Sequence, residues 1–77
     1  MFPVQSPRGH TMELLINGDT QIVDNVTNVA ELLMQLGLRE DRVAVEINSH
    51  IVRREQREKF LLNERDRIEI VSFIGGG

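Results

Sequence analysis

Cysteine is absent from this sequence of 77 residues, and so are tryptophan and tyrosine. The absence of cysteine excludes disulfides, thiolate metal sites, iron–sulfur clusters and a cysteine nucleophile. No apolar run approaches the roughly 18 residues that a membrane-spanning helix needs. No basic-then-apolar signal peptide opens the sequence. We therefore expect a small cytoplasmic protein with no membrane segment.

Charges of one sign do not form a run. Lysine and arginine number 9 against 12 aspartates and glutamates, and the formal net charge is −3. The bases after Leu38 alternate with acids, which is typical of a solvated surface and not of a stripe that follows phosphates. The phenylalanines Phe2, Phe60 and Phe73 are too scattered for base stacking. This composition argues against nucleic-acid binding.

The two histidines do not indicate catalysis or a metal site. His10 lies in residues 1–11, which contain two prolines and a glycine and are predicted to be a flexible leader; whether this leader is native stays open. His50 follows Ser49 in a predicted turn, and a Ser–His pair adjacent in sequence lacks the convergence of a catalytic triad. We predict no catalytic residue and no metal ligand in the chain.

One domain is predicted over residues 12–74, followed by a flexible glycine tail over 75–77. Apolar alternation indicates strands over 12–16 and 20–23, and the Asn-Gly pair between them is a strong hairpin signal. Further strands are predicted over the following segments: 43–47, 51–52 and 67–72.

A helix is predicted after Asn28, which has Glu31 three residues later in a capping-box spacing. Its apolar positions recur at helical spacing and form one stripe. The stripe consists of Val29, Leu32, Leu33 and Leu36. Gly37 stands where a left-handed residue ends a helix.

Residues 53–59 are highly charged and predict a short helical turn on the surface, with Phe60 as its anchor to the core. The pairs Arg54–Glu58 and Glu55–Lys59 have i,i+4 spacing. The order of elements predicts an α+β fold with the β-grasp layout: a mixed sheet of four or five strands with one main helix on one face. The first and last strands are then central parallel neighbours.

Gly75, Gly76 and Gly77 follow a strand that is apolar to its end. Three extended glycines reach roughly 10 Å, and a backbone without side chains can enter a narrow channel in another protein. Because one helix covers one face of the sheet, Leu15, Ile22, Val71 and Phe73 are expected on the other face. We predict a partner-docking surface next to the tail. Its residues are Leu15, Val71, Phe73 and Ile74.

These residues resemble the ThiS family of sulfur carrier proteins of thiamine biosynthesis. The resemblance covers the chain from residue 12 to 77. The matching stretches are Asn-Val-Ala-Glu-Leu-Leu at 28–33, Leu-Gly-Leu at 36–38, Val-Ala-Val-Glu-Ile-Asn at 43–48, Ile-Val at 51–52 and Asp-Arg-Ile-Glu-Ile-Val-Ser-Phe-Ile-Gly-Gly-Gly at 66–77. Members often have Asn-Gly where this chain has Asn48-Ser49.

The resemblance implies that Gly77 is the modified residue. A ThiF-like adenylyltransferase uses ATP and Mg²⁺ to make an acyl-adenylate of its carboxylate. Sulfur from a persulfide donor, such as a cysteine desulfurase, then displaces AMP and leaves a thiocarboxylate. A ThiG-like thiazole synthase consumes that sulfur. The carrier itself binds no cofactor and catalyses none of these steps.

Three alternatives stay open at this point. A molybdopterin synthase small subunit (MoaD-like) shares the fold, the tail and the thiocarboxylate chemistry. A ubiquitin-like modifier would instead join Gly77 to lysines through isopeptide bonds. A plain β-grasp binding module would have a tail without function.

Overall fold

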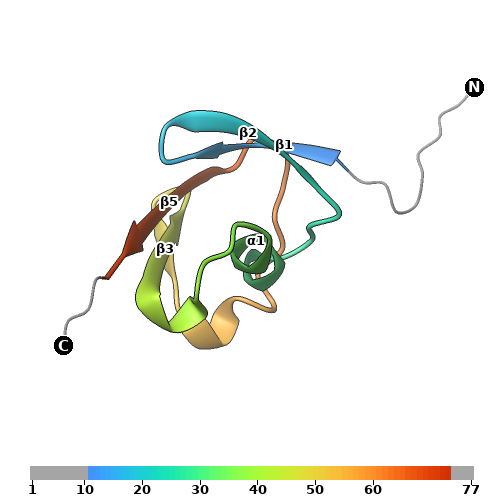
Figure 1. The fold of residues 1–77 in the computed structure, drawn as a ribbon. Coiled ribbons are helices and arrows are strands. Elements are labelled where there is room, and N and C mark those ends of the chain that lie inside the picture. Colours follow the sequence, from blue (N-terminus) through green and yellow to red (C-terminus); the bar gives the residue numbers. More distant parts are fainter. Residues whose placement is uncertain (1–10, 74–77) are drawn as a thin grey trace, which may run out of the picture.

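The computed structural model of this chain describes residues 11–73. Its strands are β1 (Thr11–Ile16), β2 (Asp19–Asp24), β3 (Val43–Ile47), β4 (His50–Val52) and β5 (Arg67–Ser72), and its helix is α1 (Val29–Gln35). The strands form one five-stranded sheet in the order β2-β1-β5-β3-β4. Figure 1 shows this sheet curving around α1. The predicted α+β class and β-grasp layout are confirmed, because β1 and β5 are parallel neighbours at the centre.

Two hairpins flank the central strand β5. β1 and β2 are antiparallel and meet at Asn17 and Gly18, whose φ angles are 50° and 87°. Positive φ at both positions fits the two-residue turn that the Asn-Gly pair predicts. β3 and β4 meet in the same way at Asn48 and Ser49, with φ angles of 50° and 74°. Ser49 therefore holds a left-handed conformation that favours glycine.

Helix α1 is capped at both ends. The Asn28 side chain accepts the N–H of Glu31 at 2.8 Å, and the Glu31 carboxylate accepts the N–H of Thr27 at 2.7 Å. The predicted capping spacing is thus confirmed. The return bond from the Glu31 side chain goes to the residue before the N-cap and not to the N-cap itself. At the other end Gly37 has φ 76°, and the N–H of Leu38 donates to a carbonyl of the last turn at 2.9 Å. This is the Schellman closure.

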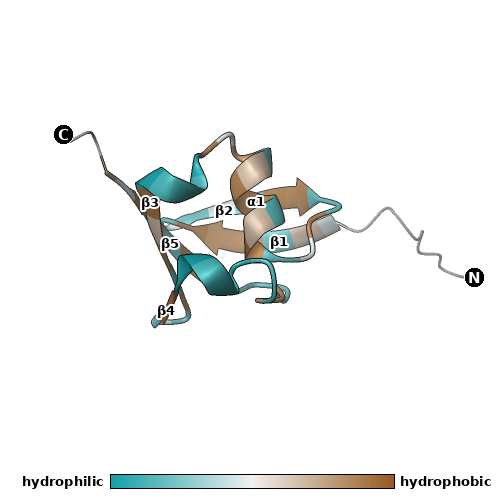
Figure 2. Ribbon diagram, turned by 90° about the horizontal axis from the view of Figure 1, so that it is seen from below, coloured by the Kyte–Doolittle hydropathy of each residue, from teal (hydrophilic) through white to brown (hydrophobic). Residues whose placement is uncertain are grey.

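The core lies between α1 and the covered face of the sheet. Inward-facing side chains of the strands contact the apolar stripe of the helix. The residues with no exposed surface are Leu14, Val29, Leu32, Leu33 and Ile68. Burial of each such side chain contributes about 1.5–3 kcal/mol. Figure 2 shows brown colour on α1 and the strands, and teal on the two short helical turns beside β3 and β4.

The charged segment 53–59 is only partly as predicted. It contains a short 3₁₀ turn, η2 (Arg54–Gln56), and Phe60 packs against the core as expected. The two predicted i,i+4 ion pairs do not form, because one 3₁₀ turn is too short to align them. The prediction that residues 53–59 all lie on the surface is wrong for Arg57, which is only 4% exposed. Its guanidinium binds backbone carbonyls beneath the surface.

Three strands begin one residue earlier than predicted. β2 begins at Asp19 and also ends one residue later than predicted, at Asp24. β1 begins at Thr11, opposite Asp24, and β4 begins at His50, opposite Ile47. His50 therefore belongs to a strand and not to the turn. Backbone pairing continues past the apolar residues that reveal a strand, which explains these differences.

Candidate functional site

The end of β5 leads to the predicted tail. Ser72 lies opposite Val43 in the antiparallel pairing of β5 with β3. One residue further, the N–H of Phe73 donates to the carbonyl of Arg42 at 2.7 Å. Backbone hydrogen bonds therefore hold the chain in place up to Phe73, directly before the glycine-rich end of the sequence.

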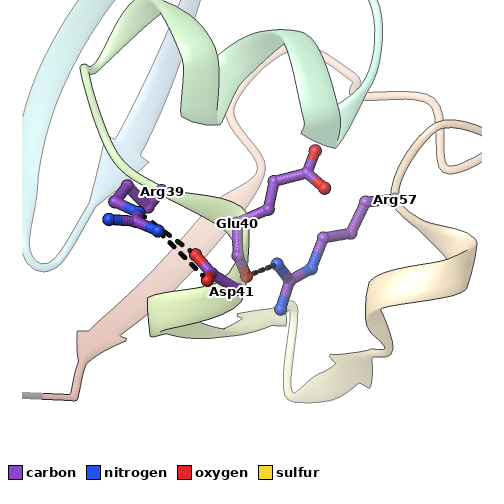
Figure 3. A network of polar contacts seen from close by, with 4 residues as sticks. All are labelled: Arg39, Glu40, Asp41 and Arg57. Atoms are coloured by element: carbon purple, nitrogen blue, oxygen red, sulfur yellow. Dashed lines mark hydrogen bonds and ion pairs between the residues drawn. The ribbon is translucent and has the colours of Figure 1, made fainter. Parts of the chain in front are cut away.

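Arg57 fixes the segment that supplies the Arg42 carbonyl. Its Nη1 donates to the carbonyl of Glu40 at 2.8 Å, and its Nη2 donates to the carbonyl of Val43 at 2.9 Å. Figure 3 shows the contact with Glu40. Glu40 precedes Arg42 in the chain and Val43 follows it. The buried guanidinium therefore fixes the backbone on both sides of the Arg42 carbonyl. Its Nε is buried and has no hydrogen-bond partner among residues 11–73.

Arg39 and Asp41 form an ion pair on the outside of the same segment, which contains the turn η1 (Glu40–Arg42). The Nε and Nη2 atoms of Arg39 donate to the two Asp41 carboxylate oxygens, each at 3.3 Å. Desolvation raises the pKa of Asp41. The charge and hydrogen bonding of Arg39, together with a backbone hydrogen bond and the charge of Arg42, outweigh desolvation and lower that pKa below its usual value. An exposed pair of this kind adds little to stability.

A group of exposed apolar side chains lies on the uncovered face, beside the end of β5. We call this group the end patch, and its members are Ala44, Ile51, Val71 and Phe73. Ile51, Val71 and Phe73 are 72%, 59% and 54% exposed. Ala44 lies directly opposite Val71, and strand alternation places Phe73 on the same face. Exposed apolar groups gathered in this way are typical of protein interaction sites.

A shallow hollow of about 210 Å³ lies within the end patch. Its apolar walls come from three neighbouring strands, β3, β4 and β5, and two carboxylates complete its rim. The lining residues are Ala44, Val45, Glu46, Ile51, Glu69 and Val71.

Leu15 lies away from the end patch. It is half-buried on the uncovered face and pairs with Arg67, the first residue of β5. Val71 is four residues further along the strand, which is roughly 13 Å. The structure therefore brings Val71 and Phe73 together and places Leu15 elsewhere on the same face.

The remaining predicted site residues are outside the described part of the chain. They are Ile74 of the docking surface and the tail residues Gly75, Gly76 and Gly77. Ile22, predicted for the uncovered face, is 65% exposed there on β2.

Ile51 and Ala44 were missed when the docking surface was predicted. The inward position of Val52 implies that Ile51 points outward, but a three-residue strand is too short to display alternation. Arg57 was missed for another reason: within a run of charged residues, no local signal marks the one that is buried.

Among residues 11–73 no group of three or more histidine, cysteine, aspartate or glutamate side chains is arranged to hold a metal ion. Within the same residues no helix is long and apolar enough to cross a membrane.

The five-stranded sheet packed on α1, with β5 at its centre leading to the end of the chain, defines a ubiquitin-like β-grasp domain. The sequence profile of the ThiS family matches residues 9–77, and the chain belongs to this family. The crystal structure of the thiamine biosynthesis protein ThiS from Geobacter metallireducens superimposes with a TM-score of 0.73. That protein is 35% identical in sequence, and the match covers 86% of this chain and 100% of that chain.

Two curated relatives are named thiazole synthase. They come from Paramagnetospirillum magneticum and Magnetococcus marinus, and each is 41% identical over 66 residues, or 86% of this chain. The chain spans only 20% of the length of each relative. In these proteins a segment similar to this chain is therefore part of a much longer polypeptide.

Proposed function

We propose that this chain is a sulfur carrier protein of thiamine biosynthesis, and that its Gly77 carboxylate carries sulfur as a thiocarboxylate. The observation that carries the proposal is the end of β5. The backbone is hydrogen-bonded up to Phe73 beside an exposed apolar patch, and three glycines follow shortly after it in the sequence. Membership of the ThiS family supports the same function.

The Gly77 carboxylate is a poor electrophile, so the proposed chemistry begins with its activation. An oxygen of the Gly77 carboxylate attacks the α-phosphorus of ATP, pyrophosphate leaves, and an acyl-adenylate forms. A persulfide sulfur then attacks the carbonyl carbon and AMP leaves with the bonding electrons, which gives an acyl disulfide. A second thiol reduces the sulfur–sulfur bond and releases the thiocarboxylate. The ATP, the Mg²⁺ and the thiols belong to partner enzymes.

In this proposal the chain supplies a substrate and a docking surface and no catalytic group. Its partners are a ThiF-like adenylyltransferase, a persulfide donor such as a cysteine desulfurase, and a ThiG-like thiazole synthase, all in the cytoplasm. The tail residues Gly75, Gly76 and Gly77 enter the partner active sites. The end patch, with Ile74 beyond it, contacts the partner surface around each entrance.

The thiazole branch is favoured over a molybdopterin synthase by the two relatives named thiazole synthase. A segment like this chain inside such a polypeptide is expected if the carrier and the synthase act together. Copurification with a thiazole synthase or with a molybdopterin synthase large subunit discriminates between the two pathways.

The test is mass spectrometry of the C-terminal tryptic peptide, residues 68–77. The protein is incubated with ATP, Mg²⁺, the activating enzyme and a persulfide donor. Replacement of oxygen by sulfur nearly equals methionine oxidation in mass, and this peptide contains no methionine. A mass gain that an alkylating reagent can cap identifies the thiocarboxylate.

The other outcomes are equally informative. An adenylate that never acquires sulfur from a competent donor, together with conjugates of higher mass in lysate, indicates a ubiquitin-like modifier. No change at all, with an enzyme active on another carrier, overturns the proposal in favour of a binding module.

A further inference from the structure

The turn between β1 and β2 contains the only asparagine–glycine pair of the sequence, Asn17 and Gly18. An asparagine loses ammonia when the backbone nitrogen of the next residue attacks the carbon of its carboxamide. Glycine hinders this attack least, because it has no Cβ beside the attacking nitrogen. Both residues are exposed, and no atom of residues 11–73 outside the turn lies within 4 Å of where a Cβ of Gly18 would stand. The turn is therefore open to the water that the reaction consumes.

The folded structure holds the Asn17 carboxamide away from this reaction. Its Oδ1 accepts the N–H of Ile70 at 2.7 Å, and its Nδ2 donates to the Ile70 carbonyl at 3.1 Å. The backbone N–H of Asn17 donates to the carbonyl of Ile68 at 2.8 Å, which fixes the turn against β5 as well. Rotation of the carboxamide towards the Gly18 nitrogen breaks both bonds to Ile70. The reaction therefore waits for a local opening between this turn and β5.

We propose that Asn17 is a site of spontaneous deamidation, restrained by its bonds to Ile70, and that the modification in turn releases the end of β5. The Gly18 nitrogen gives its proton to hydroxide and attacks Cγ of Asn17. A bond forms between these two atoms, the bond from Cγ to Nδ2 breaks, and ammonia leaves with a proton from the solvent. Water then opens the resulting succinimide ring at either carbonyl, the ring nitrogen regains its proton, and aspartate or isoaspartate remains. The net reaction consumes water, releases ammonia and requires no enzyme, oxidant or reductant.

Both products lose part of the connection to β5. Aspartate keeps an oxygen for the N–H of Ile70, but it puts a second oxygen where Nδ2 faced the Ile70 carbonyl. That carbonyl is then left without its donor and beside a negative charge. Isoaspartate carries the backbone through an additional methylene, which changes the turn length that sets the register of β1 with β2. Each product therefore loosens β5 shortly before Phe73, beside the end patch.

The other asparagines provide internal comparisons within the same chain. Asn48, in the other hairpin, precedes Ser49, whose Cβ hinders attack by the backbone nitrogen. Asn25 is exposed and also has a positive φ, 58°, but it precedes the β-branched Val26. Exposure and a left-handed backbone are thus shared with Asn25, whereas the glycine that follows is particular to Asn17.

The experiment follows deamidation of the unchanged chain, folded in buffer and unfolded in guanidinium chloride, by mass spectrometry. Incubation in heavy-oxygen water labels every aspartate or isoaspartate that forms before digestion. Fragmentation of the tryptic peptides 9–39 and 43–53 distinguishes Asn17 from Asn25 and Asn48. We expect Asn17 to convert first in both conditions, and at least about tenfold more slowly in the folded chain. Equal rates in the two conditions, or another asparagine ahead of Asn17, overturn the proposal.

Three variants separate the chemistry from its consequence. Gly18→Ala adds a Cβ beside the attacking nitrogen and should slow conversion of Asn17 about tenfold in the denaturant, where its effect on folding plays no part. Asn17→Asp imitates one product, and Asn25→Asp makes the same charge change at another exposed residue with positive φ.

Hydrogen exchange of the Phe73 amide should be about tenfold faster in Asn17→Asp than in Asn25→Asp. Equal exchange in these two variants overturns the release of β5, and an unchanged rate of conversion in Gly18→Ala overturns the attack by the Gly18 nitrogen. The measurement on the unchanged chain needs no variant, so it tests the site even if Asn17→Asp fails to fold.

Discussion

Asn17 holds the backbone of Ile70 with both ends of its side-chain amide. Its Oδ1 accepts the N–H of Ile70 at 2.7 Å, and its Nδ2 donates to the carbonyl at 3.1 Å. β1 ends at Ile16, so the amide continues the pairing of β5 where the neighbouring strand has turned away. Asn48 acts similarly from the other hairpin, accepting the N–H of Arg67 at 3.0 Å. The central strand is thus fixed from both sides by turn asparagines.

Replacing Asn17 with glycine tests this role. Glycine tolerates the positive φ of this position but leaves the N–H and carbonyl of Ile70 without partners. We expect the free energy of unfolding to fall by about 1–3 kcal/mol in urea denaturation. The matched control is Asn25→Gly, because Asn25 also has positive φ, 58°, and is exposed. An equal loss in both variants would show that the amide bonds contribute nothing.

Replacing Arg57 with alanine should destabilise the fold by about 2–4 kcal/mol, because one buried and one part-buried carbonyl lose charged donors. Arg54→Ala, an exposed neighbour, should change stability by less than about 0.5 kcal/mol.

Hydrogen exchange adds a local measurement. The amide of Phe73, bonded to the Arg42 carbonyl, should lose protection in the Arg57 variant even below its unfolding transition. Unchanged protection of the Phe73 amide would show that Arg57 does not help to hold the end of β5 in place.

Glycine at position 49 should stabilise the protein. Ser49 has φ 74°, where a Cβ is strained, and glycine removes that strain at the expense of greater freedom in the unfolded chain. We expect a gain of about 0.5–1 kcal/mol in thermal or urea denaturation. Ser49→Ala keeps the Cβ and should give no gain. If alanine and glycine stabilise equally, the hydroxyl and not the backbone is responsible.

An acidic residue at position 73 should impair transfer without unfolding the protein. Phe73 is 54% exposed in the end patch, so Phe73→Asp places a charge where an apolar partner surface is proposed. We expect the rate of thiocarboxylate formation to fall about tenfold or more. Met34→Asp is the control, since Met34 is 75% exposed on α1. Equal rates in both variants would exclude Phe73 from the interface.

The elements that could be predicted from the sequence are those whose signals are local. The Asn-Gly turn, the capping of α1 by Asn28 and the closure at Gly37 each depend on residues within a few positions. Val71 was also expected on the uncovered face, and the structure confirms that it is exposed there. Turn chemistry, caps and periodicity act before any tertiary contact forms, and here the tertiary structure agrees with them.

The relations that could not be predicted join distant parts of the chain. Leu15 and Val71 share a face, but only the register of β1 against β5 shows that they are far apart on it. The opposition of Glu46 and Glu69 likewise depends on the pairing of β3 with β5. Arg57 is buried because two carbonyls from another segment happen to face it, and no pattern in its own neighbourhood encodes them.

The placement of β5 has a consequence for synthesis on the ribosome. It is the last strand to be made among those described, yet it lies at the centre of the sheet, with Leu15 paired to Arg67 across most of the chain. The two hairpins cannot join until this strand inserts between them, and such long-range closure makes folding slow compared with local structure. A nascent or damaged chain therefore lacks the assembled face beside residue 73 that is proposed for docking. Partners that recognise this face would act on completed carriers and ignore fragments.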